Sequence, residues 1–331
     1  QSGGVYANTA TVTAPGGLSD SDMSHYESVP KIVAPKFFVV DQAKDLSYQY
    51  AEGGSGLGSF ALANTDPRDI AANADGSLLW VLDRDKNVEV YKGDGTQLGQ
   101  WKAYGLGTEP EGITLDGKDL WMADRAGKLY WYDNAATRTS GTDSPESSFT
   151  LSLAGNLKGI VTDGTYLWAV TEGTSDYVYR FKIVRDWWGN PSGLSQSGGW
   201  QLPTANAKPT GITLDPSGKS DSLWIVDEST DTVYEYGYGR SQTWGVGTIT
   251  AHFKLSPGNT APQGIADPLP AGGEAFDLAE ISAAPGLETT QPDPYAGDFV
   301  TSLFDDAIAF HDAGIVGTSA QSEATLALLH A

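Results

Sequence analysis

The chain of 331 residues contains no cysteine, so neither a disulfide framework nor thiol chemistry can support it. Positive charge is scarce, because 20 Lys and Arg face 42 Asp and Glu and the formal net charge is −22. So acidic a chain is repelled by phosphate backbones and by anionic lipid, which argues against nucleic-acid and membrane-surface partners. No apolar run approaches the roughly 18 residues of a membrane span, so none is predicted.

What the chain does have is a repeat. Pro-x-Gly-Ile-x-x-Asp is followed by a turn, by Leu-Trp-Val-x-Asp, by a second turn and by Val-x-x-Tyr. Its isoleucines are Ile70, Ile113, Ile160, Ile212 and Ile265, which lie 43, 47, 52 and 53 positions apart. This is the period of a four-stranded propeller blade. Five blades are therefore predicted.

The last copy of the repeat holds only its first strand, before Pro268. The missing strands are found at the other end, at 37–41, 46–50 and 59–62. We therefore predict an all-β fold, a five-bladed β-propeller in which residues 37–63 and 262–267 share one blade. Closing the ring by pairing an N-terminal with a C-terminal strand removes exposed strand edges.

Large aromatic residues recur at fixed blade positions and are predicted to fill the wedges between blades. The second strands supply Phe38, Trp80, Trp121, Trp168 and Trp224, and the fourth strands supply Phe60, Trp101, Phe149, Trp200 and Phe253. Most of the Trp content is thus assigned to the core.

Residues 1–36 form a separate segment before the propeller at 37–267. The β-branched run from Val5 to Thr13 predicts one strand, and nothing else in this flank reads as its partner. A single strand is stable only as part of a sheet. We therefore expect this strand to be donated to a neighbouring subunit, or to belong to a domain whose other strands are missing from this chain. A disordered leader is the alternative. The residues predicted to mediate assembly are Tyr6, Thr9, Thr11 and Val12.

Residues 268–331 carry ten acidic residues and no Lys or Arg, which indicates a solvated or interacting extension. Phe299, Leu303 and Phe304 fall at helical spacing, so a short helical extension is predicted there. These residues are assigned to assembly, with packing beneath the propeller as the alternative. The chain begins at Gln1, which predicts a processed chain or a segment of a longer one.

Residues 37–267 resemble the five-bladed, NHL/SMP-30-like propeller modules of very large bacterial surface proteins. The resemblance is carried by the blade phrases, by Pro-Gln-Gly-Ile-Ala-Asp-Pro at 262–268 and by Arg-Thr-Ser-Gly at 138–141. Asn-Thr-Ala-Thr-Val-Thr at 8–13 resembles the last strand of an immunoglobulin-like bacterial repeat domain. Blade three departs from the pattern at Leu157 and Thr171.

The resemblance implies a bacterial cell-surface or extracellular location and a non-enzymatic structural or adhesive role, as part of an adhesin or filament. The expected partners are copies of the chain itself or adjacent domains of a larger surface protein. A lectin-like propeller is the alternative, followed by a glycosidase or lyase. No catalytic motif is found in the sequence, and we expect no enzyme.

The turn after the second strand carries an Asp in most blades, and these side chains are predicted to surround one channel mouth. Asp83, Asp124 and Asp227 are candidate calcium ligands, and Glu111 with Asp83 or Asp124 is a candidate acid/base pair. Recurrence of the Asp favours a turn-capping role instead. Asp20 and Asp22 are predicted as a calcium site in the linker before the propeller.

Blade three's repeat contains an insertion, Asp186 to Pro191, with two adjacent Trp in a Gly/Pro loop. Trp187 and Trp188 are predicted to bind a glycan or to anchor a partner, with Glu111 as a further ligand-binding candidate. Packing against the side of the propeller or against the C-terminal helices is the alternative.

Overall fold

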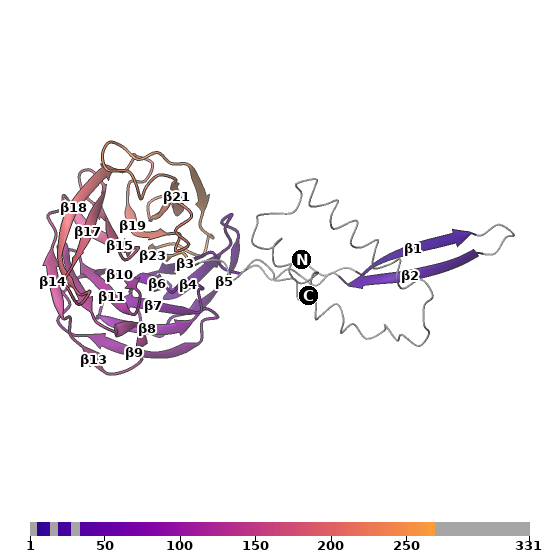
Figure 1. The fold of residues 1–331 in the computed structure, drawn as a ribbon, viewed down its shortest axis with the longest axis horizontal. Coiled ribbons are helices and arrows are strands. Elements are labelled where there is room, and N and C mark those ends of the chain that lie inside the picture. Colours follow the sequence, from indigo (N-terminus) through magenta and orange to yellow (C-terminus); the bar gives the residue numbers. More distant parts are fainter. Residues whose placement is uncertain (1–4, 14–18, 28–33, 269–331) are drawn as a thin grey trace. The chain divides into compact units, whose positions relative to one another are not determined.

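The computed structural model describes residues 5–13, 19–27 and 34–268, and its propeller is all-β (Figure 1). Five sheets of four or five strands surround one axis. The first is β23 (Pro262–Ala266), β3 (Phe37–Asp41), β4 (Leu46–Tyr50) and β5 (Gly56–Ala61). The second is β6 (Pro67–Ala72), β7 (Leu78–Asp83), β8 (Asn87–Lys92) and β9 (Gln97–Ala103), with β13 (Thr142–Asp143) on its outer edge.

The other three sheets follow the chain in order from the axis outward. The third is β10 (Pro110–Asp116), β11 (Asp119–Asp124), β12 (Lys128–Tyr132) and β14 (Ser147–Thr150), with a 3-10 turn, η1 (Ala135–Thr137), before β13. The fourth is β15 (Asn156–Thr162), β16 (Tyr166–Glu172), β17 (Tyr177–Arg185) and β18 (Pro191–Gln201). The fifth is β19 (Pro209–Leu214), β20 (Leu223–Asp227), β21 (Thr232–Tyr236) and β22 (Ala251–Lys254).

The predicted closure of the ring is confirmed. Strand β23, near the end of the described chain, pairs antiparallel with β3 near its start, with Ile265 opposite Val39 (Figure 1). The Asp41 carboxylate strengthens this joint, because it accepts hydrogen bonds from the backbone N–H groups of Thr260 and Ala261. The ring is thus held by strand pairing and by a buried charge-assisted contact.

The same register occurs in every blade. The Pro position of the Pro-x-Gly-Ile phrase, which is Leu157 in β15, lies opposite the last residue of the Leu-Trp-Val-x-Asp phrase, as for Pro110 and Asp124. A β-bulge follows at once in all five innermost strands. A bulge adds a residue and bends the strand, so the x residue of Pro-x-Gly-Ile is set apart from the regular ladder.

After the bulge the five innermost strands approach one another so closely that four of them carry glycine. A Cβ atom built on Gly264 would lie 2.4 Å from the Cα of Asp69 in the next blade. On Gly211 it would lie 2.6 Å from the carbonyl oxygen of Gln263. Only the β6 strand departs, with Asp69 at this position. Backbone contact at the axis therefore explains the Gly in the repeat.

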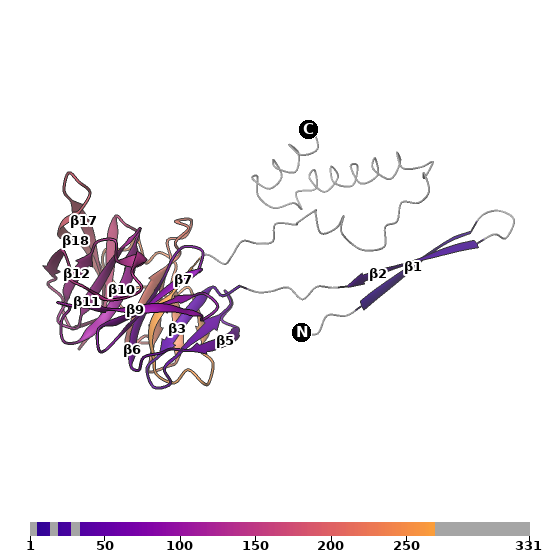
Figure 2. The same cartoon turned by 90° about the horizontal axis from the view of Figure 1, so that it is seen from below.

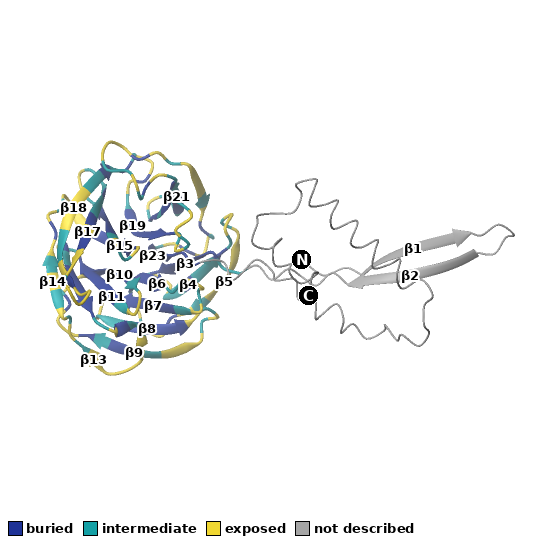
Figure 3. Cartoon of the chain, in the orientation of Figure 1, coloured by how far each residue is buried: buried dark blue, intermediate teal, exposed yellow. Residues whose placement is uncertain are grey.

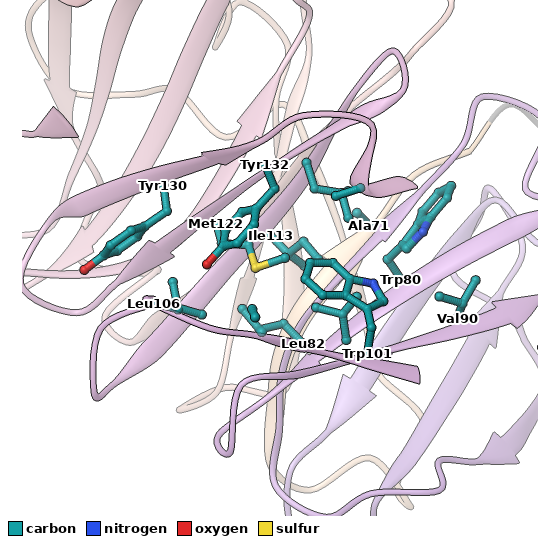
Figure 4. Close-up of a cluster of buried hydrophobic side chains, with 14 residues drawn as sticks. Ala71, Trp80, Leu82, Val90, Trp101, Leu106, Ile113, Met122, Tyr130 and Tyr132 are labelled. Carbon is teal, nitrogen blue, oxygen red and sulfur yellow. The ribbon is translucent and has the colours of Figure 1, made fainter. Parts of the chain in front are cut away.

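The wedges between blades are filled as predicted (Figure 4), and the inner strands of the sheets are largely buried (Figure 3). One cluster joins the second and third sheets, where the Trp101 and Tyr132 rings meet edge to face at 5.7 Å. Trp80, Leu82 and Met122 belong to the same cluster and are at most 2% exposed. Trp224, Phe60, Phe149 and Phe253 are half-buried rather than buried. Interlocking aromatic side chains therefore hold neighbouring blades together.

The N-terminal strand is not an orphan, and that prediction is wrong. Strand β1 (Val5–Thr13) pairs antiparallel with β2 (Ser19–Glu27), from Val5 opposite Glu27 to Thr13 opposite Ser19. The second strand was missed because its sequence, Ser-Asp-Ser-Asp-Met-Ser-His-Tyr-Glu, contains no β-branched residue and two strand-disfavouring Asp. Pairing with β1 overrides that low propensity.

The helical extension predicted around Phe299, Leu303 and Phe304 lies outside the described residues. In the part of the chain that the structure does describe, no helix has the length and apolarity to cross a membrane.

We expect Gly264→Ala to lower the free energy of unfolding by about 3 kcal/mol, because its Cβ meets backbone atoms that cannot move without opening the ring. The matched control is Gly53→Ala, in a loop where no atom lies within 4 Å of the new Cβ. Urea unfolding should show the control within about 0.5 kcal/mol of the parent chain. Equal stabilities for the two variants would contradict the axial role of Gly264.

Candidate functional site

The bulged x residues form a polar group at the start of the innermost strands. They are Arg68, Glu111, Lys158, Thr210 and Gln263, and each is at most 8% exposed. Unlike the glycines that follow them, they differ in every blade. The site therefore has an asymmetric set of functional groups on a near-symmetric frame.

Glu111 is ion-paired across two blades. Its Oε1 accepts a hydrogen bond from Arg125 Nε at 2.8 Å and lies 2.6 Å from Arg125 Nη2, and its Oε2 lies 3.7 Å from Lys158 Nζ. Lys158 also lies 3.5 Å from a Glu172 carboxylate oxygen. The hydrogen bond to Glu111 raises the pKa of Arg125. Glu111 is only 1% exposed, and its carboxylate mainly balances the charges of the buried Lys158 and the half-buried Arg125.

A hollow of about 120 Å³ adjoins this network. It is lined by Arg68, Arg84, Glu109, Pro110, Glu111 and Arg125. Arg68 and Arg84 both reach Asp66, at 3.1 and 3.4 Å. The lining is almost wholly charged and internally paired, so the hollow suits a small polar group rather than an apolar one.

The recurring Asp side chains bond within their own surroundings. Asp124 accepts hydrogen bonds from the Lys128 N–H at 3.0 Å and from the Tyr130 hydroxyl at 2.9 Å. Burial raises the pKa of Tyr130, and the hydrogen bond to Asp124 raises it further. Asp83 accepts from the Asn87 N–H at 2.8 Å and from its amide at 2.7 Å. These contacts fix the turn after the second strand, which is the turn-capping alternative.

The proposed metal ligands are not brought together. Asp227 accepts hydrogen bonds from the N–H groups of Lys208 and Thr230, both at 2.7 Å. Over residues 34–268 and the two described N-terminal strands, no three His, Asp or Glu side chains are placed to hold one ion. Asp20 and Asp22 lie in β2, opposite Val12 and Ala10, and not in a linker.

Two buried carboxylates of the channel were missed from the sequence. Asp69 stands where the other blades have Gly, and its oxygens accept hydrogen bonds from the Ile70 and Ile113 N–H groups, both at 2.9 Å. Burial raises the pKa of Asp69 well above its usual range. The signal for it was the break in the repeat itself, Pro-Arg-Asp-Ile.

The second missed carboxylate is Asp267, which lies at the far end of the same channel. Its Oδ1 is 2.5 Å from Lys36 Nζ, and its side chain is fully buried. Burial raises the pKa of Asp267 to about 8, against the lowering effect of Lys36. It lines a cavity of about 360 Å³ formed by the C-terminal halves of the innermost strands.

The Trp loop is exposed and ordered. Trp187 and Trp188 are 92% and 82% exposed at the tip of the β17–β18 hairpin, which extends beyond the neighbouring blades (Figure 2). The Asp186 carboxylate accepts hydrogen bonds from the N–H groups of Trp188 and Asn190, at 2.9 and 2.8 Å. Trp244 is 81% exposed in a second loop. Within the described residues the two indole rings of the tip therefore do not pack on the propeller.

No protein-family model and no curated protein matches the chain. Solved structures similar to it include a humanized mutant of the Chaetomium thermophilum Polycomb Repressive Complex 2 bound to the inhibitor GSK343. That match has 8% sequence identity and a TM-score of 0.44, and it covers 70% of this chain and 62% of that one. Kuenenia stuttgartiensis hydrazine synthase matches with 16% identity, a TM-score of 0.38 and coverage of 60% and 72%.

Hsv2 of Kluyvelomyces marxianus matches with 14% identity, a TM-score of 0.36 and coverage of 55% of this chain and 68% of that one. An Hsv2 variant with loop 6CD replaced by a Gly-Ser linker matches over 52% of its length. At such low identity and TM-score, these likenesses carry no argument about function.

We expect Glu111→Gln to lower the free energy of unfolding by about 2 kcal/mol, because Arg125 and the buried Lys158 lose their shared counter-charge. Glu109→Gln is the control, since Glu109 is 58% exposed and lies 3.9 Å from the same Arg125. Urea unfolding should place the control within about 0.5 kcal/mol of the parent. A loss of similar size in both variants would contradict this account.

Stability should also depend on pH. The pKa values of Asp69 and Asp267 are raised in the folded state, so their protonated forms favour folding. Their contribution is complete below pH 4 and is lost as pH rises toward about 8 for Asp267. In chemical unfolding between pH 5 and 8.5, Asp267→Asn should show a smaller fall in stability than the parent chain. Parallel pH profiles for the two chains would show that Asp267 does not titrate in this range.

Proposed function

We propose that the chain is a non-enzymatic, extracellular structural and adhesive module of a bacterial surface assembly, and that the tip of its β17–β18 hairpin contacts the partner. The observation that carries this proposal is the pair of exposed indole rings on an ordered tip. The extracellular location rests on the resemblance to surface-protein propellers and on the acidic, cysteine-free composition.

Exposure of the two rings is costly for an isolated chain. Burying one large apolar side chain stabilises a protein by about 3 kcal/mol, and here two adjacent ones stay in solvent. Trp is enriched among the residues that dominate binding energy. Because the Asp186 hydrogen bonds already order the loop, a partner that buries these rings pays little further entropy.

The end of β17 beside the Trp loop is also fixed. Arg185 donates a hydrogen bond to the Asp116 carboxylate at 2.6 Å and another to the Gly164 carbonyl oxygen at 3.1 Å. Asp116 ends strand β10 and Gly164 lies in the turn between β15 and β16, so both acceptors are outside the hairpin. These contacts hold the projecting strands against the ring, so the tip acts as a rigid protrusion suited to a recess on another protein.

The N-terminal hairpin supplies a second connection in this proposal. A two-stranded sheet is marginally stable alone, and among the described residues neither β1 nor β2 pairs with a third strand. Addition of the hairpin to a sheet of a second copy, or of an adjacent domain, would complete it. The residues assigned to this contact are Tyr6, Thr9, Thr11 and Val12, with Phe299, Leu303 and Phe304 for the C-terminal extension.

We propose Asp20 and Asp22 as the calcium ligands in this assembly, because they lie two residues apart on the same strand, β2. The ring carboxylates are weaker candidates, because Asp83, Asp124 and Asp227 already accept hydrogen bonds in their own turns. Such a site would tie the N-terminal hairpin to a neighbouring domain.

Glycan binding is the second candidate function, and the adjacency of Trp187 and Trp188 favours it. Indole faces stack on the apolar faces of sugar rings, and both rings are open to solvent. Glu111 is a poor sugar ligand by comparison, since its carboxylate is 2% exposed and ion-paired.

We expect Trp187→Ser/Trp188→Ser to weaken self-association at least tenfold, as measured by sedimentation velocity, without lowering thermal stability. The control is Trp244→Ser, an equally exposed Trp of another loop, which should associate like the parent. If the parent does not self-associate but binds a glycan array through Trp187 and Trp188, the lectin-like candidate replaces the assembly one. A parent chain that does neither would overturn both.

A further inference from the structure

The cavity at the far end of the channel has a largely apolar wall. Its lining begins at the isoleucine of each innermost strand, Ile70, Ile113, Ile160, Ile212 and Ile265, and continues through the residues that follow. None of the five bulged x residues lines it. Its volume, about 360 Å³, falls within the range of small-molecule sites, which are mostly apolar with a few placed polar groups.

One ionisable side chain lines this cavity, and its hydrogen-bonding capacity is not used up. Asp267 pairs with Lys36 through Oδ1, whereas Oδ2 is buried and has no hydrogen-bond partner among the described residues. A buried carboxylate oxygen without a donor is costly. A ligand that brings a donor to Oδ2 would remove this cost.

The charges around Asp267 favour a cationic donor. The Asp215 and Glu52 carboxylates lie close enough to oppose ionisation of Asp267, and Lys36 is the opposing cation. Once Asp267 is ionised, three carboxylates against one ammonium group make the local field negative. An anion would be repelled there, and a neutral donor would gain less than a cation.

We propose that this cavity binds a small organic amine, with its apolar body between the innermost strands and its ammonium group on Asp267. This site is independent of the Trp hairpin and goes beyond the adhesive role. Burial of the hydrocarbon part drives binding, and the carboxylate selects for charge. The affinity should also rise with pH up to about 8, because the ammonium group binds the ionised form of Asp267.

The test is isothermal titration calorimetry of the full chain with 1-naphthylmethylamine and with the neutral 1-naphthalenemethanol. Salt at 0.15 M screens attraction to the acidic surface, at roughly an 8 Å Debye length. We expect the amine to bind at least tenfold more tightly than the alcohol. In Asp267→Asn this preference should vanish, while the alcohol binds as before. Equal binding of both probes to the parent, or no saturable binding of either, overturns the proposal.

A second variant keeps the test decisive if Asp267→Asn does not fold. Ala74 lines the mouth of the cavity and is itself exposed, so Ala74→Trp narrows the entrance without disturbing the core. Binding of both probes should fall at least tenfold. Ala154→Trp, an exposed position away from the cavity, is the matched control and should bind like the parent. Unchanged amine binding by Ala74→Trp would place the amine elsewhere and overturn the proposal. The Trp187→Ser/Trp188→Ser variant should bind the amine like the parent chain.

Discussion

The contact on which this fold depends is the approach of five innermost strands around the axis. Four glycines let the backbones touch, and Asp69 fills the fifth position by accepting hydrogen bonds from the N–H groups of Ile70 and Ile113. The side chain thus supplies acceptors to backbone donors that have no ladder partner on the channel side. Blade register, the bulges and the placement of the x residues all follow from this packing.

Repeated and unrepeated positions of the blade have different physical roles. The Asp that ends the second strand recurs in four blades because it holds the turn that follows, as Asp83 and Asp124 do. The x residues vary because each faces different neighbours at the channel mouth, and Glu111 and Lys158 form an ion pair between adjacent blades. Side chains that could distinguish one ligand from another therefore lie at the positions where the repeat is least regular.

The sequence predicted what a period can encode: the number of blades, their strand order, the closing pair β23 and β3, and the aromatic wedges. It did not predict the partner of β1, because β2 forms through pairing and not through its own propensity. Asp267 was missed because its buried contact with Lys36 joins residues from the two ends of the propeller sequence, which meet only when the ring closes. For the Trp pair the sequence left exposure and packing on the propeller as alternatives, because the composition of a loop does not decide whether it folds back on a sheet.

The pairing of β23 with β3 also decides how the ring responds to force. The chain enters β3 just after Lys36 and leaves β23 just before Asp267, and these two residues touch. Tension applied through both flanks therefore acts at the same end of the β23–β3 pair. It would break the hydrogen-bonded residue pairs between the two strands one after another. The Lys36–Asp267 ion pair is the first contact in that series. The closed ring would thus yield to a pull at the single seam where its two ends meet.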